Sequence, residues 1–337
     1  MNNNQIPLLD NLRALAAWSV CLYHFMCTTT GFLDPEGMIY KTFYFGQNGV
    51  QLFFIISGLV IPWSMYEKGY RIENLGRFIL KRLIRLEPPY MFSVLAMLAV
   101  IFLRKYSPSY DGIQKEVTLQ QVCMHLGYLI PFSDHLEWLN NVYWTLAIEF
   151  QYYFFMAFAF YFFTSGNILF RSAGYLLLFV PSFLFGKTAF LPIWLPLFGI
   201  GISLFQFKKK IIGNIEFGIV ALVALAVLIL LGQKEAAVIG LAGGFLILFF
   251  SNYSFSWLTQ LGKHSYSVYL IHPILGATVL NVLSHYVHST SGKFSIVVLA
   301  VLITAAGSYL MYRMIEKPSK RISSSILYRG RKKQTKE

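Results

Sequence analysis

Residues 8–27 read LLDNLRALAAWSVCLYHFMC, a segment long enough to cross a bilayer as a helix, yet it contains an aspartate, an arginine and a histidine. Ionisable side chains at membrane depth are costly, so they indicate a functional site. The interval from Arg13 to His24 is about three helical turns, which places both side chains on nearly the same face. Ala17 and Cys21 fall between them on that face. This spacing predicts a small, open stripe that leads from the arginine to the imidazole.

The composition is that of a membrane protein. Of the 337 residues, 56% are hydrophobic and only 13% are charged, about half the charged fraction of a soluble domain. Apolar runs of about 20 residues recur along the chain, which predicts an all-α, polytopic membrane protein embedded in a lipid bilayer. The net charge of +13 is concentrated in short connections and in the C-terminal segment, so it indicates membrane topology and not nucleic-acid binding. The three cysteines show no metal-ligand or redox spacing, and we expect no metal.

We predict one domain, residues 1–337, with a core of residues 8–318 and a basic cytoplasmic tail of residues 319–337. Lys and Arg are enriched in the connections after even-numbered helices, so this side should be cytoplasmic and should carry both termini. No cleavable signal peptide is apparent, and the first helix should serve as the targeting signal. About ten transmembrane helices are predicted, at residues 8–28, 47–66, 87–105, 142–163, 168–186, 190–207, 211–231, 235–252, 266–287 and 294–315.

Three local features accompany this prediction. Pro88 and Pro89 suit the first turn of a helix, so we expect the third helix to begin at about residue 87. The connection of residues 106–141 is long for a loop, and its LQQVCMHLGYLIPF portion predicts a short interfacial or re-entrant helix. The tail after about Pro318 is expected to be frayed and to touch anionic lipid.

Two polar groups lie near the ends of predicted helices. Asn48 and Gln51 share one face of the second helix, where they either form interhelical hydrogen bonds or line a site beside His24 at a similar depth. Arg82 and Arg85 share a face at the cytoplasmic mouth of the third helix. They either set the topology or form a phosphate clamp, because guanidinium groups match phosphate geometry.

The fourth and ninth predicted helices carry the remaining candidates. Glu149 has no cationic neighbour one turn away, so it is either a structural carboxyl or the group that orients His24. Trp144 and Tyr152 belong either to an aromatic belt or to a platform for a sugar ring. His272 precedes a proline that should kink its helix, so it is either a hinge residue or a second candidate base.

Six motifs, in this order, resemble those of acyltransferase family 3, the integral-membrane acyltransferases that modify bacterial surface sugars. They are LDNLRALAAWSVCLYH, GVQLFFIISG, RFILKRLIRLEPPY, WTLAIEFQYY, LGKHSYSVYLIHP and the terminal EKP, and they extend from Leu8 to Pro318. The chain departs from the resemblance at Asn11 and Gln51, where many members have glycine and aspartate. An acidic role at position 51 is therefore excluded.

The resemblance implies a ten-helix core in the bacterial cytoplasmic (inner) membrane that takes acyl groups from acyl-CoA, usually acetyl-CoA, at the cytoplasmic side. It implies that the acceptor is a carbohydrate hydroxyl at the outer side, on a surface polysaccharide, a lipid-linked sugar or a small glycoside. It further implies that His24 is the essential base, and that Arg13, Arg82 and Arg85 belong to the donor site.

The chemistry of O-acyl transfer suits these residue types. A thioester already has a good leaving group, so the protein must supply positioning and a proton acceptor for a weakly acidic hydroxyl, a role that neutral imidazole at His24 can fill. Asn48 is the candidate for stabilising the oxyanion. Together with Asn48, the side chains of Gln51, Trp144 and Tyr152 are expected to contact the acceptor.

The donor path and one alternative complete the prediction. We expect Asp10 to pair with arginines near the cytoplasmic surface, because about 21 Å of helix separates it from His24. The pantetheine arm of the donor should follow the face of Ala17 and Cys21. The alternative function is a multi-pass transporter of an anionic or sugar-linked substrate, because kinked helices and buried charges also occur in transporters.

Overall fold

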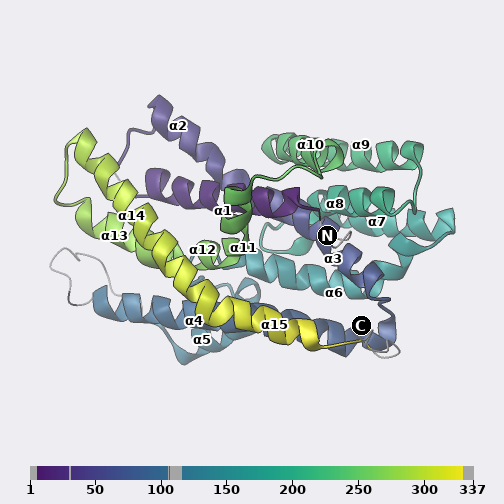
Figure 1. The fold of residues 1–337 in the computed structure, drawn as a ribbon, viewed down its shortest axis with the longest axis horizontal. Helices are drawn as coiled ribbons and strands as arrows, with labels where there is room; N and C mark the ends of the chain where they lie inside the picture. Colours follow the sequence, from purple (N-terminus) through teal and green to yellow (C-terminus); the bar gives the residue numbers. More distant parts are fainter. Residues whose placement is uncertain (1–5, 30–31, 105, 107–115, 329–337) are drawn as a thin grey trace.

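The computed structural model describes residues 6–29, 32–104, 106 and 116–328, and this part of the chain is helical and contains no strand. Helix α1 runs through the middle of the bundle, and it contacts α3, α11 and α12 (Figure 1). The principal helices are α1 (Leu8–Cys27), α2 (Met38–Tyr44), α3 (Gly49–Glu67), α4 (Leu75–Arg104), α5 (Leu119–Leu126), α6 (Trp144–Thr164), α7 (Ile168–Leu184), α8 (Leu195–Lys208), α9 (Asn214–Leu230), α10 (Lys234–Phe249), α11 (Ser256–Lys263), α12 (Ser265–Ile271), α13 (Thr278–Leu283), α14 (Thr290–Met311) and α15 (Lys317–Ser325). Short 3-10 helices are η1 (Phe45–Asn48), η2 (Ile72–Asn74), η3 (Ile130–Phe132) and η4 (Leu191–Trp194), and π-helical turns are η5 (Pro273–Ala277) and η6 (Tyr312–Glu316).

The expected all-helical membrane architecture is confirmed. Within the described residues, six helical segments are long and apolar enough to cross a membrane, and two shorter apolar helices accompany them. Helix α1 is not among the six, because its polar residues lower its hydropathy. The count of about ten spans and the side of the termini stay predictions. The six segments are Met38–Glu67, Ile72–Arg104, Trp144–Thr164, Leu191–Lys208, Ser265–Leu283 and Thr290–Ser325.

Glycines let α3 approach two neighbouring helices closely. A Cβ atom on Gly49 would lie 2.4 Å from the carbonyl oxygen of Ala16 in α1, and one on Gly58 would lie 2.3 Å from that of Phe198 in α8. Such distances are far below van der Waals contact, so these backbones can meet only where a side chain is absent. The first turn of α3 is therefore held directly against α1.

Helix α4 extends further toward its N-terminus than predicted. It begins at Leu75, and Pro88 and Pro89 lie inside it, so the prediction of a helix start at about residue 87 was wrong. The turns before the prolines bury Phe78 and Arg82 against the rest of the protein. This tertiary packing stabilises a helix that the prolines alone would have interrupted.

Helix α15 packs along α4, as Figure 1 shows at the lower edge of the molecule. The Nζ atom of Lys81 donates to the carbonyl oxygens of Ser323, at 2.9 Å, and Ile326, at 2.6 Å. The hydroxyl of Ser323 donates in return to the Lys81 carbonyl at 2.7 Å. The prediction of a frayed tail is thus corrected for the residues up to 328, and residues 329–337 lie outside the described part of the chain.

A π-helical turn joins α12 to α13 and begins at Pro273. Pro273 has no amide hydrogen, so it cannot donate a helical hydrogen bond. At the end of the turn, the Ala277 amide donates to the carbonyl oxygen of His272 at 3.0 Å, which is the hydrogen-bond spacing of a π-helix. The predicted irregularity directly after His272 is therefore present. It lies where α12 and the π-turn both contact α1, and the side chain of His272 is completely buried there.

The connection before α6 contains the predicted short helix, α5, although residues 107–115 lie outside the described part. Thr118 caps α5 by accepting a hydrogen bond from the Gln121 amide at 3.1 Å. The Nδ1 atom of His125 donates to the Gln121 carbonyl at 2.8 Å, and its Nε2 accepts from the Leu139 amide at 2.9 Å. Burial lowers the pKa of His125, which keeps the imidazole neutral in this arrangement.

Candidate active site

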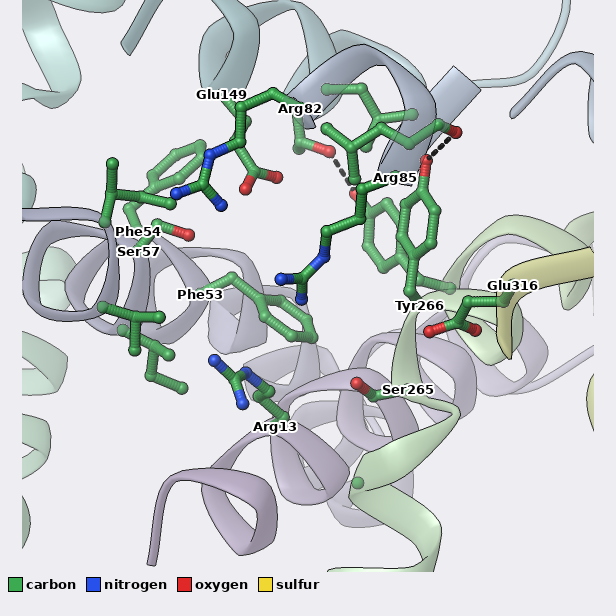
Figure 2. Close-up of a pocket in the computed structure, with 18 of the residues that line it drawn as sticks. Arg13, Phe53, Phe54, Ser57, Arg82, Arg85, Glu149, Ser265, Tyr266 and Glu316 are labelled. Atoms are coloured by element: carbon green, nitrogen blue, oxygen red, sulfur yellow. Dashed lines mark hydrogen bonds between the residues drawn. The ribbon is translucent and has the colours of Figure 1, made fainter. Parts of the chain in front are cut away.

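A cavity of about 550 Å³ lies between α1, α3, α4, α6 and α12. The guanidinium groups of Arg13, from α1, and of Arg82 and Arg85, from α4, point into it (Figure 2). Lys263 and Lys320 add two further cations to its wall. We call it the basic cavity. Its size is that of a small-molecule site, and its guanidinium groups suit a ligand that carries phosphate.

The arginines of the basic cavity are held in different ways. Arg13 donates to the carboxylate of Asp10 at 2.8 Å, which is the type of pairing expected for Asp10. The guanidinium of Arg82 lies 5.2 Å from the ring of Phe78 and 5.3 Å from that of Tyr153. Only 9% of Arg82 is exposed, and its Nε has no hydrogen-bond partner in the described structure. A buried cation with an unused donor favours an anionic ligand.

Glu149 lines the basic cavity, together with the arginines. Its Oε1 accepts a hydrogen bond from the Tyr153 hydroxyl at 2.5 Å, and Figure 2 shows its carboxylate next to Arg82. The structure therefore brings Glu149 to the arginines of α4 and not to His24, which it was expected to orient. The reason is that its side chain projects from α6 toward α4.

A second cavity, of about 310 Å³, contains His24. Asn48, Gln51 and Trp144 also line it, so three of the four side chains expected at the acceptor site lie together beside the imidazole. Tyr152 is not brought to them. It is fully buried and stacks on a phenylalanine of α8 with 4.0 Å between ring centroids. We call this second space the histidine cavity.

His24 is paired with a second histidine. Its Nδ1 lies 2.9 Å from the Val20 carbonyl oxygen and 3.1 Å from Nε2 of His272. A carbonyl oxygen can only accept, so Nδ1 of His24 carries the hydrogen and Nε2 keeps its lone pair. Nδ1 of His272 lies 3.1 Å from the Val268 carbonyl, so Nε2 of His272 is likewise an acceptor. This chain of hydrogen bonds leaves Nε2 of His24 free to take a proton.

Among the residues that the structure describes, two line both cavities, Val50 of α3 and Tyr269 of α12. The hydroxyl of Tyr269 lies 2.8 Å from the Thr145 hydroxyl and donates to the Val142 carbonyl at 3.2 Å, which fixes the ring in place. These two side chains therefore lie where the basic cavity and the histidine cavity adjoin.

The stripe of Ala17 and Cys21 is closed. Both residues are 0% exposed, and they belong to a packed apolar cluster with Val268 and Leu280. The prediction that the donor arm follows this face was therefore wrong, because the face is packed against other helices, α12 among them.

Comparison with known families decides the class of protein. A family model described as an acyltransferase domain matches residues 6–313. The chain belongs to acyltransferase family 3. Comparisons with curated proteins and with solved structures give no match. The resemblance found in the sequence motifs is thus confirmed, and the family does not favour the transporter alternative.

Sequence reasoning missed several residues of the candidate site. Tyr269, Trp194 and Glu235 line the histidine cavity, but they come from separate helices and no spacing connects them to His24. For His272 the sequence held one cue, a histidine directly before a proline in an apolar helix. In the described part of the acyltransferase, no group of three His, Cys, Asp or Glu side chains could hold a metal ion.

Proposed function

We propose that this acyltransferase moves an acetyl group from acetyl-CoA to a hydroxyl of a carbohydrate. The observation that supports this proposal is the adjacency of two unlike cavities, one lined by arginines and one by His24, which share Val50 and Tyr269. Transfer between two substrates needs an anion-binding donor site that opens next to a base, so that the reacting atoms meet.

The basic cavity is the proposed donor site. Arg13, Arg82 and Arg85 would hold the phosphates of CoA, since guanidinium groups form paired hydrogen bonds with phosphate oxygens. In this donor site the carboxylate of Glu149 would limit the orientations that the guanidinium group of Arg82 adopts. The thioester end of the donor would then reach the histidine cavity past Tyr269.

His24 is the proposed general base. The acceptor hydroxyl attacks the thioester carbonyl carbon while its proton passes to Nε2 of His24. The C–S bond then breaks, and the CoA thiolate takes that proton, so the products are an ester and a free thiol. His272 is a positioning residue in this scheme, because its Nε2 accepts the Nδ1 hydrogen of His24 and stabilises the imidazolium. The amide of Asn48 is the candidate donor to the oxyanion.

The histidine cavity is the proposed acceptor site, with Asn48, Gln51 and Trp144 as contacts. The lysine and arginine bias of the connections supports an orientation in which the basic cavity opens to the cytoplasm, where acetyl-CoA is made. The acceptor, a surface polysaccharide, a lipid-linked sugar or a small glycoside, would then be modified at the outer side of the bacterial inner membrane.

Thiol release from acetyl-CoA tests the proposal. The purified protein in detergent is mixed with acetyl-CoA and a glycan extract from the surface of the producing cells. We expect thiol release and glycan-bound acetyl groups, and His24→Ala should reduce both by about 10²- to 10⁴-fold, the usual contribution of a general base.

His135→Ala is the matched control, because His135 is an exposed histidine that lines neither the basic nor the histidine cavity. It should retain the wild-type rate. An unchanged rate in His24→Ala, or glycan-dependent transport without thiol release, would refute the proposal.

A further inference from the structure

The charge of the histidine cavity differs from that of the basic cavity. Three arginines and two lysines line the basic cavity, where they outnumber its three carboxylates. The described residues that line the histidine cavity include neither lysine nor arginine, and Glu235 is the one carboxylate among them. A negatively charged ligand is thus favoured in one cavity and opposed in the other.

Glu235 is an exposed carboxylate in the first turn of α10, which places it toward solvent at the edge of the histidine cavity. A carboxylate accepts hydrogen bonds from hydroxyl groups and repels other carboxylates and phosphates. At the edge of the histidine cavity, the Glu235 carboxylate therefore attracts or repels each ligand that enters from solvent.

Two tryptophans form an apolar wall in the same cavity. The rings of Trp144 and Trp194 lie 5.4 Å apart between centroids, inclined at 35°. The indole nitrogen of Trp194 donates to the Thr188 carbonyl at 2.8 Å, so its N–H is used and its ring is fixed. Such a wall suits the C–H face of a sugar ring, whose hydroxyl groups need separate polar partners.

Those polar partners are amide side chains. Gln47, Asn48, Gln51 and Asn141 line the cavity, and each amide offers both donors and an acceptor. Oε1 of Gln51 is buried and has no hydrogen-bond partner in the described structure. An unused acceptor beside uncharged amides matches a ligand that presents neutral hydroxyl groups.

This inference rests on the proposed function and narrows its acceptor. We propose that the histidine cavity takes a pyranose ring without anionic groups, and that Glu235 excludes sugars that carry a carboxylate or a phosphate. Trp144 and Trp194 hold the ring by its apolar face, and the amides select its hydroxyl groups. Uronic acids and sugar phosphates are therefore poor acceptors, whereas neutral hexoses and N-acylated hexosamines are good ones.

The test uses radiolabelled acetyl-CoA and p-nitrophenyl β-galactoside as acceptor, with the full-length protein in detergent. The β-fucoside and the β-galacturonide compete for the site. Neither competitor has the 6-hydroxyl of the galactoside: the fucoside carries a methyl group at that position and the galacturonide carries a carboxylate. The ratio of their half-maximal inhibitory concentrations therefore measures the effect of the charge.

We expect the fucoside to inhibit labelling at a concentration about fivefold lower than the galacturonide, the effect of one like charge at about 4 Å in water. Glu235→Gln should remove most of this difference, and ~0.5 M salt should reduce it by screening. Asp134→Asn is the matched control, because Asp134 is an exposed carboxylate that does not line the cavity. It should leave the ratio unchanged.

Equal inhibition by the two competitors would overturn the inference, and so would an unchanged ratio in Glu235→Gln. Thiol release from acetyl-CoA without labelling of the galactoside would also overturn it while leaving the donor half of the proposed function standing. If no acceptor, including the surface glycan extract, elicits thiol release, the proposed function itself fails and the inference fails with it.

Discussion

Replacing His272 by phenylalanine should slow acyl transfer without weakening donor binding. His272 is fully buried among aromatic rings, with its centroid 6.1 Å from that of Tyr269 and 6.3 Å from that of Phe25. A phenylalanine ring fills nearly the same space, so the helix pair should stay packed. What the substitution removes is the nitrogen that lies 3.1 Å from Nδ1 of His24.

The size of the effect follows from the geometry. A hydrogen bond to a charged group contributes about 1.5–3 kcal/mol, and this one gains its charge when His24 becomes an imidazolium. The Val20 carbonyl, 2.9 Å from the same Nδ1, stays as an acceptor. We therefore expect the lower end of that range, about tenfold in kcat. The KM for acetyl-CoA should not change, because His272 does not line the basic cavity.

A double-mutant cycle measured by thiol release provides the assay. The wild type is compared with His272→Phe, His24→Ala and the double variant at saturating acetyl-CoA. If His272 acts only through His24, its substitution costs nothing further once the imidazole of His24 is gone. A wild-type kcat in His272→Phe, or the same tenfold loss in the His24→Ala background, would refute the reasoning.

Three further predictions concern the donor, the packing and pH. Arg82→Ala should raise the KM for acetyl-CoA about 10- to 100-fold, and Arg82→Lys should recover only part of it, because an ammonium group forms no paired bonds with phosphate. Gly58→Ala should lower the free energy of unfolding by about 1–3 kcal/mol, because its Cβ would meet a backbone carbonyl. In the control Gly76→Ala the added Cβ meets no atom within 4 Å, so the free energy of unfolding should stay close to that of the wild type. Thermal unfolding measures both variants. Since burial lowers the pKa of His125, the stability gained from its neutral form should be complete above about pH 6.5 and fall below it, and His125→Gln should flatten the dependence of Tm on pH.

Each of these predictions can fail in a specific way. An unchanged KM in Arg82→Ala would exclude this side chain from the donor site. Equal unfolding temperatures for Gly58→Ala and Gly76→Ala would show that the contact between α3 and α8 relaxes at little cost. A wild-type Tm that does not fall below about pH 6.5 would contradict the assigned role of the His125 imidazole.

Much of the fold could be predicted, because helices in membranes are marked by long apolar runs and by the charges between them. The family motifs, together with positions near the cytoplasmic ends of predicted helices, predicted that one site contains Arg13, Arg82 and Arg85. The start of α4 was mistaken, because buried contacts of Phe78 overrode the local preference of two prolines. Local sequence carries no record of such contacts.

The parts of the site that could not be predicted depend on how helices rotate against one another. The approach of His272 to His24 joins residues 248 positions apart, and no periodicity encodes it. Helical spacing placed Glu149 at a depth near His24, but it could not give the direction in which α6 turns that carboxylate. The same ambiguity made the face of Cys21 look open, although it is buried in a packed apolar cluster.

The clamp between α4 and α15 has a consequence for biosynthesis. Lys81 and Ser323 are 242 residues apart, so the ribosome delivers the partner of α4 long after α4 itself has entered the membrane. Until then the helix that carries Arg82 and Arg85 lacks its lateral support. A partly translated chain therefore cannot complete this packing. Because Lys320 of α15 also lines the basic cavity, that cavity takes its final form only after α15 has been synthesised.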